Sequence, residues 1–137
     1  ARADEPNAFA GILNLTDSFA VTSGGYQRYF EEGGITYHHI IDPSTGYPAD
    51  SGLTSVTVVA PADSRAYYNG TMCDAYSTAL FVMGEERALD FWRDRNNGVS
   101  VFDLVLVTED GRVVVTGGLA DRFTLDESGG YAYEVVS

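Results

Sequence analysis

The sequence contains no lysine, and its eight basic side chains, all arginines, are outnumbered by twenty acidic ones. The resulting net charge of −12 leaves no basic surface of the kind that phosphate backbones require. Nucleic acid is therefore not an expected partner, and neither is an anionic membrane surface. A small anionic ligand would need a metal ion or backbone amides to offset its charge.

Cysteine is almost absent, since Cys73 is the single one. One cysteine excludes an internal disulfide and a cysteine-based zinc site. Its neighbours Met72 and Asp74 do not provide the electropositive setting that activates a thiol, so we expect Cys73 to be buried and inert. The sequence also lacks an apolar run long enough to span a membrane, and no signal peptide is visible at residue 1.

The apolar content is sufficient for one domain, because 45% of the 137 residues are hydrophobic and 12% are aromatic. We expect residues 1–137 to form that single domain. Alternating and Val/Thr-rich segments predict strands at 19–23, 35–41, 53–60, 101–107, 112–115 and 131–136. Helices are predicted at 65–83, after the cap candidates Asp63 and Ser64, and at 85–96. This order is an α+β pattern with two central helices.

The two predicted helices have different expected contacts. In the first, apolar residues recur at helical spacing before the candidate C-cap Gly84, namely Ala75, Ala79, Leu80 and Met83. In the second, the residues expected to pack are Leu89, Phe91 and Trp92. Its expected solvated face consists of Glu85, Glu86, Asp90 and Asp94.

Asp74 and Thr78 are four residues apart on the first predicted helix, so they share one face. A carboxylate and a hydroxyl offer oxygen ligands to a hard cation such as magnesium, and Ser77 could add another oxygen. The alternative is that Asp74 is a solvated residue and that Thr78 bonds back to a backbone carbonyl.

Two further segments contain candidate binding residues. His38 and His39 point to opposite faces of a regular strand, so only one of them can face a given site. A pocket histidine could transfer a proton or bind a phosphate, and the alternative is a structural histidine. The following D-P-S-T-G stretch at 42–46 has the residues of a tight turn, and a T-S-G-G stretch at 22–25 could present backbone amides to an anion.

Four stretches, taken together, resemble the ApbE family, the FAD:protein FMN transferases. T-S-G-G-Y-Q-R-Y-F at 22–30 is similar to that family's T-S-G-x-Y-x-R-Y-F, and H-H-I-I-D-P-S-T-G-Y-P at 38–48 to its H-x-I-D-P-x-T-G-x-P loop. S-V-T-V-V-A-P at 55–61 is similar to the next strand, and D-A-Y-S-T-A-L-F-V-M-G at 74–84 to the metal-binding helix. The stretches occur in the family's order and approximate spacing.

The resemblance implies a mixed β-sheet packed with the two central helices, and it implies an enzyme. Members of the family move the FMN part of FAD onto a threonine or serine of a target flavoprotein, release AMP, and use a divalent metal, usually Mg²⁺. By position, the implied metal ligands are Asp74, Thr78 and, more weakly, Ser77. The implied FAD-binding residues are His39, Ile41, Thr45, Gly46, Ser23 and Gly24, and His39 is the candidate for a catalytic role.

Two departures from the family pattern matter. Family members are longer, and their first half contains a D-x-G-x-x-A-K-G stretch that this lysine-free sequence lacks. We therefore expect the chain to be the C-terminal half of a longer transferase, inactive without the missing N-terminal half. The family's acceptor proteins carry a D-x-x-[ST]-G-A-[ST] site that is also absent, so the chain resembles the modifying enzyme.

Three functions stay open on the sequence. The first is part of an Mg²⁺-dependent transferase that acts on FAD and an acceptor flavoprotein. The second is a relative that binds or hydrolyses FAD without transfer, and the third is a catalytically silent module. The resemblance also implies an extracytoplasmic location, either periplasmic or as a membrane-anchored lipoprotein.

Overall fold

A computed structural model describes residues 9–25, 29–62, 70–97 and 101–137. The predicted caps Asp63 and Ser64 and the first predicted helical residues, 65–69, lie outside the described residues. Among the described residues, no helix is both long enough and apolar enough to cross a membrane.

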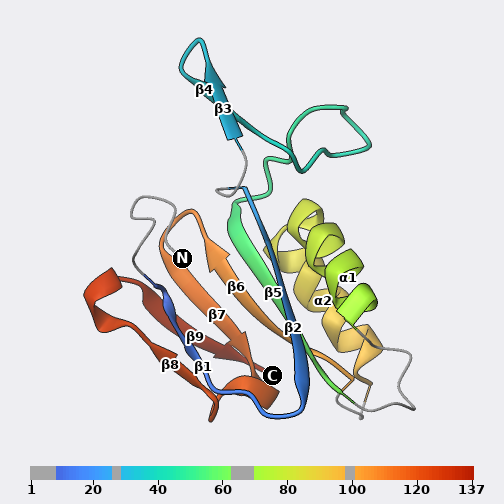
Figure 1. Cartoon of the computed structure of the whole chain (residues 1–137), viewed down its shortest axis with the longest axis vertical. Helices are drawn as coiled ribbons and strands as arrows, with labels where there is room; N and C mark the ends of the chain where they lie inside the picture. Colours follow the sequence, from blue (N-terminus) through green and yellow to red (C-terminus); the bar gives the residue numbers. More distant parts are fainter. Residues whose placement is uncertain (1–8, 26–28, 63–69, 98–100) are drawn as a thin grey trace.

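A five-stranded mixed sheet forms the centre of the molecule, with the strand order β2-β5-β6-β7-β9 (Figure 1). Its strands are β2 (Ser18–Gly24), β5 (Leu53–Pro61), β6 (Asp103–Thr108), β7 (Arg112–Thr116) and β9 (Ala132–Val136). All neighbours are antiparallel except β7 and β9, which are parallel. The expected α+β fold, a mixed sheet with two helices, is confirmed.

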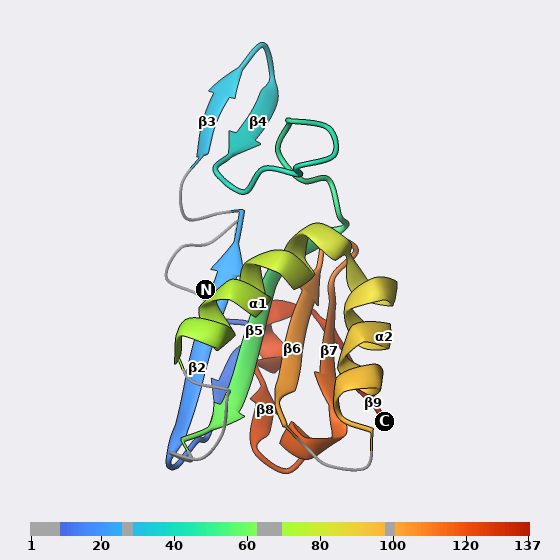
Figure 2. The same ribbon diagram turned by 90° about the vertical axis from the view of Figure 1, so that its right-hand side faces the viewer.

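Both helices cover one face of this sheet, α1 (Gly70–Met83) against β2 and β5, and α2 (Glu85–Arg95) against β6 (Figure 2). The core under the helices includes alternate residues of β5, namely Val56, Val58 and Ala60, and the α1 residues Cys73, Leu80 and Phe81. Burying this apolar surface is the main force that holds the helices on the sheet. The break between the helices falls at Gly84, whose φ of +79° favours glycine.

A two-stranded ribbon covers the opposite face of the sheet. It pairs β1 (Gly11–Leu13) with β8 (Phe123–Leu125), and its side chains Leu13, Phe123 and Leu125 pack over Val59 and other valines of the sheet. Strands β5, β6 and β7 are therefore buried on both faces, which explains their near-continuous runs of Val and Leu.

A second hairpin, β3 (Tyr29–Glu32) with β4 (Ile35–His38), projects beyond one end of the sheet and continues into the loop 39–52 (Figures 1 and 2). Gly33 and Gly34 form its turn, and both have a positive φ. The predicted strand 35–41 ends early, at His38. Beyond it, Ile41 forms only an isolated bridge with Pro48, which has no N–H with which to extend a ladder.

The packing face of α1 differs from the expected one. Ala75 and Ala79 are exposed, whereas the buried residues are Cys73, Ser77, Leu80 and Phe81. These four positions also follow helical spacing, but one of them is a serine, so the pattern of apolar residues alone does not reveal this face. The packing role of Leu89, Phe91 and Trp92 is confirmed, and the Trp92 indole donates to the Phe102 carbonyl at 2.9 Å.

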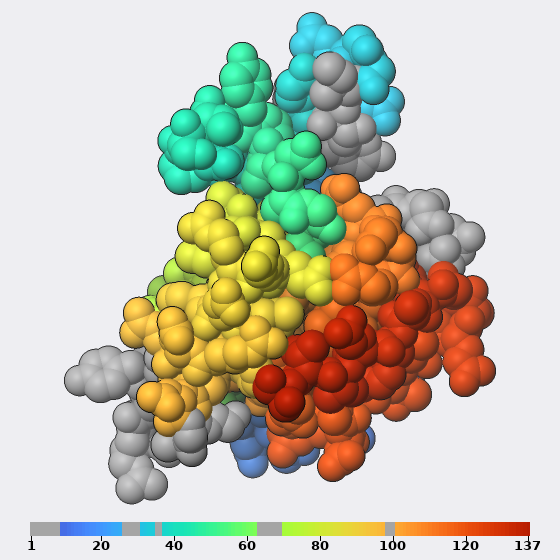
Figure 3. All heavy atoms as spheres, turned by 180° about the vertical axis from the view of Figure 1, so that it is seen from behind, coloured from blue at the N-terminus to red at the C-terminus, as the bar shows by residue number. Residues whose placement is uncertain are grey.

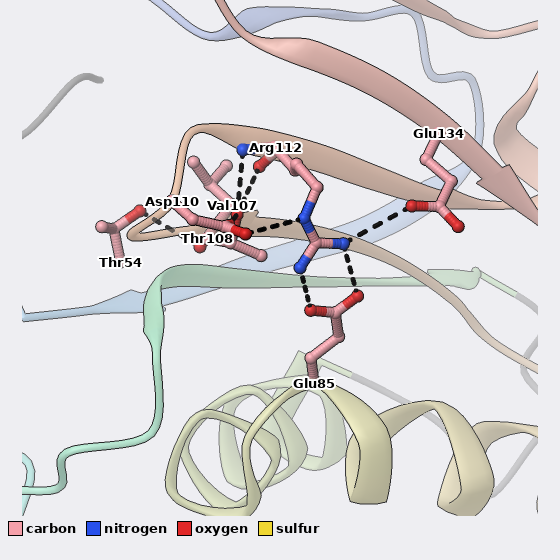
Figure 4. Close-up of polar contacts among 7 residues, drawn as sticks. All are labelled: Thr54, Glu85, Val107, Thr108, Asp110, Arg112 and Glu134. Carbon is pink, nitrogen blue, oxygen red and sulfur yellow. Dashed lines mark hydrogen bonds and ion pairs between the residues drawn. The ribbon is translucent and has the colours of Figure 1, made fainter.

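Glu85 is not part of a purely solvated face, contrary to expectation. Its carboxylate accepts two hydrogen bonds from Arg112 on β7, at 2.6 and 2.9 Å (Figure 4). Arg112 also contacts Asp110 at 3.1 Å and Glu134 of β9 at 3.4 Å. The carboxylates of Glu85 and Asp110 raise the pKa of the Arg112 guanidinium, and the hydrogen bonds to Glu85 are the main cause. Seen from behind, α2 and β9 lie side by side, and Arg112 joins them (Figure 3).

Candidate functional site

Three hydroxyl groups meet near the end of β2, where α1 packs against that strand (Figure 2). The Oγ of Ser23 on β2 lies 2.8 Å from the Oγ of Ser77 and 3.0 Å from the Oγ1 of Thr78 on α1. The Ser77 and Thr78 hydroxyls lie 2.9 and 3.3 Å from the backbone carbonyl oxygen of Asp74. We call these four residues, Ser23, Asp74, Ser77 and Thr78, the hydroxyl cluster.

The helix explains how the three α1 members of the cluster are presented. Residues 74 and 78 lie one above the other on α1, and both side chains are exposed. Ser77 is adjacent but fully buried, with an exposed fraction of 0%. A buried serine needs hydrogen-bond partners, and it finds them in the Asp74 carbonyl and in Ser23.

The donor chemistry of the cluster fits a hard divalent cation. Its outward-facing groups are one carboxylate, of Asp74, and one hydroxyl, of Thr78. Within the described residues, no group of three or more His, Cys, Asp or Glu side chains is arranged to hold a metal ion. A cation here would therefore complete its coordination with water and ligand oxygens, which is the habit of Mg²⁺ rather than Zn²⁺.

The alternative interpretation of Thr78 also has a counterpart in the structure. The 3.3 Å contact between its hydroxyl and the Asp74 carbonyl is the back-bond that many helical threonines make. This back-bond does not account for the shorter contact with Ser23, which comes from another element.

His38 connects the projecting hairpin to the rest of the molecule. Its ring lies edge-on to Phe81 of α1, with 5.6 Å between centroids, and it fills the space above Gly25, where a Cβ atom would come within 2.9 Å of the ring. The Nδ1 atom accepts the Ile40 amide at 3.3 Å, so Nε2 holds the proton and donates to the Ala49 carbonyl at 3.0 Å. His38 is thus a satisfied structural histidine.

His39 has a different environment. It follows the end of β4, and its side chain is exposed, as is that of Ile41, 47% of whose surface is accessible. Because β4 ends at His38, the two histidines do not share one regular strand, and the different exposure of their side chains distinguishes them instead. A catalytic role of His39 and an FAD contact of Ile41 stay predictions.

The loop after Ile41 closes on itself through Asp42. The Asp42 Oδ1 accepts from the Ser44 hydroxyl at 2.7 Å and the Ser44 amide at 2.8 Å, and these bonds lower the pKa of the Asp42 carboxyl. The Asp42 carbonyl accepts the amides of Thr45 and Gly46 at 3.2 and 2.8 Å. Gly46 has a φ of +75°, which the turn requires.

The structure thus divides the candidate residues into two groups. Ser23, Ser77, Thr78 and the backbone of Asp74 come together in the hydroxyl cluster, and Gly24 follows Ser23 at the end of β2. The remaining residues, His39, Ile41, Thr45 and Gly46, lie on the loop that His38 anchors to α1. The contact between Ser23 and Thr78, which are 55 residues apart, is the feature that sequence reasoning missed.

Cys73 precedes Asp74 of the cluster in sequence, but its side chain has a different environment. Its side chain is 1% exposed in the core under α1, and burial raises the pKa of its thiol. A nucleophilic cysteine needs the opposite, a lowered pKa and access to solvent. The prediction that Cys73 is buried is confirmed, and its inertness stays a prediction.

Comparison with known proteins gives a consistent result. The family model described as the ApbE family matches residues 2–102. An FAD:protein FMN transferase of Treponema pallidum is 40% identical over 111 residues, which are 81% of this chain and 28% of that protein. One of Klebsiella pneumoniae is 36% identical over 132 residues, or 96% of this chain and 37% of that protein. The chain spans about a third of the length of these relatives.

Solved structures agree with the sequence comparison. The crystal structure of the ApbE protein of Thermotoga maritima is 39% identical, with a TM-score of 0.59 over 75% of this chain and 30% of that one. The flavinyl transferase ApbE of Pseudomonas stutzeri is 30% identical, with a TM-score of 0.54 over 80% of this chain and 32% of that one. Because the family model matches most of the residues of this chain, the chain belongs to the ApbE family.

Proposed function

We propose that residues 1–137 are part of a longer, Mg²⁺-dependent FAD:protein FMN transferase, which attaches the FMN part of FAD to a threonine or serine of a target flavoprotein and releases AMP. The observation that supports this most is the hydroxyl cluster, in which Asp74 and Thr78 present oxygen ligands side by side on α1. Ser23 of strand β2 contacts the hydroxyl groups of Ser77 and Thr78. The names of the relatives support the flavin chemistry.

The reaction is a phosphoryl transfer. The acceptor hydroxyl forms a new P–O bond to the phosphorus of the FMN part, the P–O bond to the AMP part breaks, and the hydroxyl proton passes to a base or to solvent. Such reactions depend mainly on positioning and on the neutralisation of developing charge. An Mg²⁺ ion held by Asp74 and Thr78 would supply that neutralisation at the pyrophosphate.

The chain's own residues have distinct proposed roles. Asp74 is the one carboxylate of the cluster, and we assign it the main part in holding the cation. Ser23 and Gly24, with Ile41, Thr45 and Gly46 of the anchored loop, are proposed to line the FAD site. His39 is the proposed group that positions the phosphate or receives the proton, since its side chain is exposed on the loop that follows β4.

The net charge gives an independent reason for a cation. A chain with a charge of −12 repels a dinucleotide with two phosphates unless a metal ion lies between them. The protein is proposed to act outside the cytoplasm, in the periplasm or anchored as a lipoprotein. Its proposed partners are FAD, an acceptor flavoprotein and the N-terminal part of the same protein.

The full-length protein provides the test. It is incubated with FAD, Mg²⁺ and an acceptor domain that carries a D-x-x-[ST]-G-A-[ST] site, and covalent flavin is followed by in-gel fluorescence. We expect the wild type to label the acceptor and Asp74→Ala to lower the rate by at least about 100-fold, since it removes a ligand. The matched control is Asp90→Ala, which removes an exposed carboxylate of α2 paired with Arg93 and should leave the rate unchanged.

Three outcomes contradict the proposal. Absence of labelled acceptor with the wild type excludes transfer, and AMP with free FMN in its place identifies an FAD hydrolase. Equal rates for the wild type and Asp74→Ala exclude the hydroxyl cluster as the cation site.

A further inference from the structure

The hydroxyl cluster has fewer hydroxyl protons than it has contacts of hydrogen-bond length. Its three hydroxyl groups, of Ser23, Ser77 and Thr78, contribute one proton each. They make four contacts of hydrogen-bond length, two between Ser23 and the α1 hydroxyls and two with the Asp74 carbonyl. Three protons can serve only three of these contacts, so one contact has no proton.

The distances indicate which contact lacks the proton. The three shortest are Ser23–Ser77 at 2.8 Å, Ser77–Asp74 at 2.9 Å and Ser23–Thr78 at 3.0 Å, while Thr78–Asp74 is 3.3 Å. Serving the three shortest gives one order only, because the Asp74 carbonyl can accept but not donate. Thr78 donates to Ser23, Ser23 donates to Ser77, and Ser77 donates to the Asp74 carbonyl.

This order leaves the oxygen of Thr78 with two free lone pairs. Thr78 is exposed, so those lone pairs are available on the face that it shares with Asp74. Ser77 is different, because it is fully buried and both accepts and donates within the cluster. Of the two α1 hydroxyls, only that of Thr78 is therefore placed to be a cation ligand.

We propose that Ser23 is a positioning residue for the Thr78 hydroxyl. Ser23 accepts a hydrogen bond from this hydroxyl and so fixes its orientation, with the lone pairs of the Thr78 oxygen available to a cation. A hydroxyl bound to a divalent cation becomes a stronger donor, so its hydrogen bond to Ser23 strengthens when the cation binds. Ser77 ends this series of hydrogen bonds by donating to the Asp74 carbonyl oxygen of the helix backbone. The inference rests on the proposed cation site at Asp74 and Thr78.

The test measures the affinity of the full-length protein for Mn²⁺ alone, from the electron paramagnetic resonance of the free ion. We expect Ser23→Ala to weaken Mn²⁺ binding by about 10-fold or more, the usual loss when the partner of a metal ligand is removed. Ser23→Thr retains a hydroxyl and should restore the affinity. Ser23→Cys keeps the size of the side chain but accepts hydrogen bonds weakly, so it should bind like the alanine variant, and it replaces that variant if Ser23→Ala is unstable.

Two further variants separate the possible results. Ser18→Ala makes the same substitution on the same strand, at a hydroxyl that donates to the Thr16 carbonyl, and should bind Mn²⁺ like the wild type. Asp74→Ala should lose binding. If Asp74→Ala loses binding but Ser23→Ala does not, the role of Ser23 is wrong and the cation site stands. If the wild type fails to bind Mn²⁺, or if Asp74→Ala binds as well as the wild type, the cation site is wrong and the role of Ser23 with it.

Discussion

At the scale of single residues, the chemistry of the candidate site depends on contacts between side chains distant in sequence. The shared face of Asp74 and Thr78 is visible in the sequence, because a helix places residues four apart on one side. The contribution of Ser23 cannot be seen in the sequence, because it depends on β2 lying against α1. The structural role of His38 likewise follows from its neighbours Phe81, Ile40 and Ala49, whereas the role of His39 stays a prediction.

Asp42 provides a prediction at this scale. The two hydrogen bonds from Ser44 lower its pKa in the folded protein, so this carboxylate stabilises the fold above its unfolded pKa of about 3.9 and ceases to do so as the pH falls through the folded value. Ser44→Ala removes the hydroxyl donor and should raise the pKa of Asp42 toward the ordinary value, as measured by NMR titration of the side-chain carboxyl.

Ser128→Ala is the matched control for this titration. Ser128 donates its amide and hydroxyl to Asp126 Oδ1 at 3.0 and 2.7 Å, in the same local arrangement at another turn. Its removal should leave the titration of Asp42 unchanged. An unaltered Asp42 pKa in Ser44→Ala would show that the Ser44 hydroxyl does not stabilise the ionised loop.

At the scale of elements, the long and regular segments are the ones that the sequence predicts. The strands β5, β6, β7 and β9 and the helix α2 lie within a few residues of their expected ranges. The short strands β1 and β8 were not predicted, because three residues are too few to show a period. They are formed by pairing with each other and by burial over the sheet.

Gly11 tests how closely that ribbon is packed. A Cβ atom at this position would clash with the Phe123 ring and would lie 2.7 Å from the Thr124 carbonyl oxygen, which is backbone and cannot move aside easily. We expect Gly11→Ala to lower the free energy of unfolding by about 1–3 kcal/mol, as overpacking usually does. Chemical denaturation measures this change.

Gly117→Ala is the control for the ribbon. The nearest atom to its added Cβ is the Val136 carbonyl oxygen at 3.7 Å, an ordinary contact, so its effect should stay within about 0.5 kcal/mol. Equal effects of the two substitutions would mean that the β1–β8 ribbon is not closely packed at Gly11.

At the scale of the whole molecule, the order of the predicted strands and helices indicates the α+β class, and the four motif stretches indicate the family. Both are confirmed. The arrangement of layers could not be predicted, since the valine-rich strands do not reveal that helices cover one face and a ribbon the other. The two apolar clusters hold the sheet between them. The hydroxyl cluster lies on the helix-covered side, near the end of β2 from which the hairpin and its loop project (Figure 2).

We propose above all that Asp74 and Thr78 hold a divalent cation. Crystals of the full-length protein grown with Mn²⁺ and FAD, measured by anomalous scattering, test it most directly. We expect an anomalous peak at ordinary ligand distance, about 2.1 Å, from both the Asp74 carboxylate and the Thr78 Oγ1, with Ser23 still hydrogen-bonded to Thr78. A bound Mn²⁺ ion that contacts neither residue would contradict it.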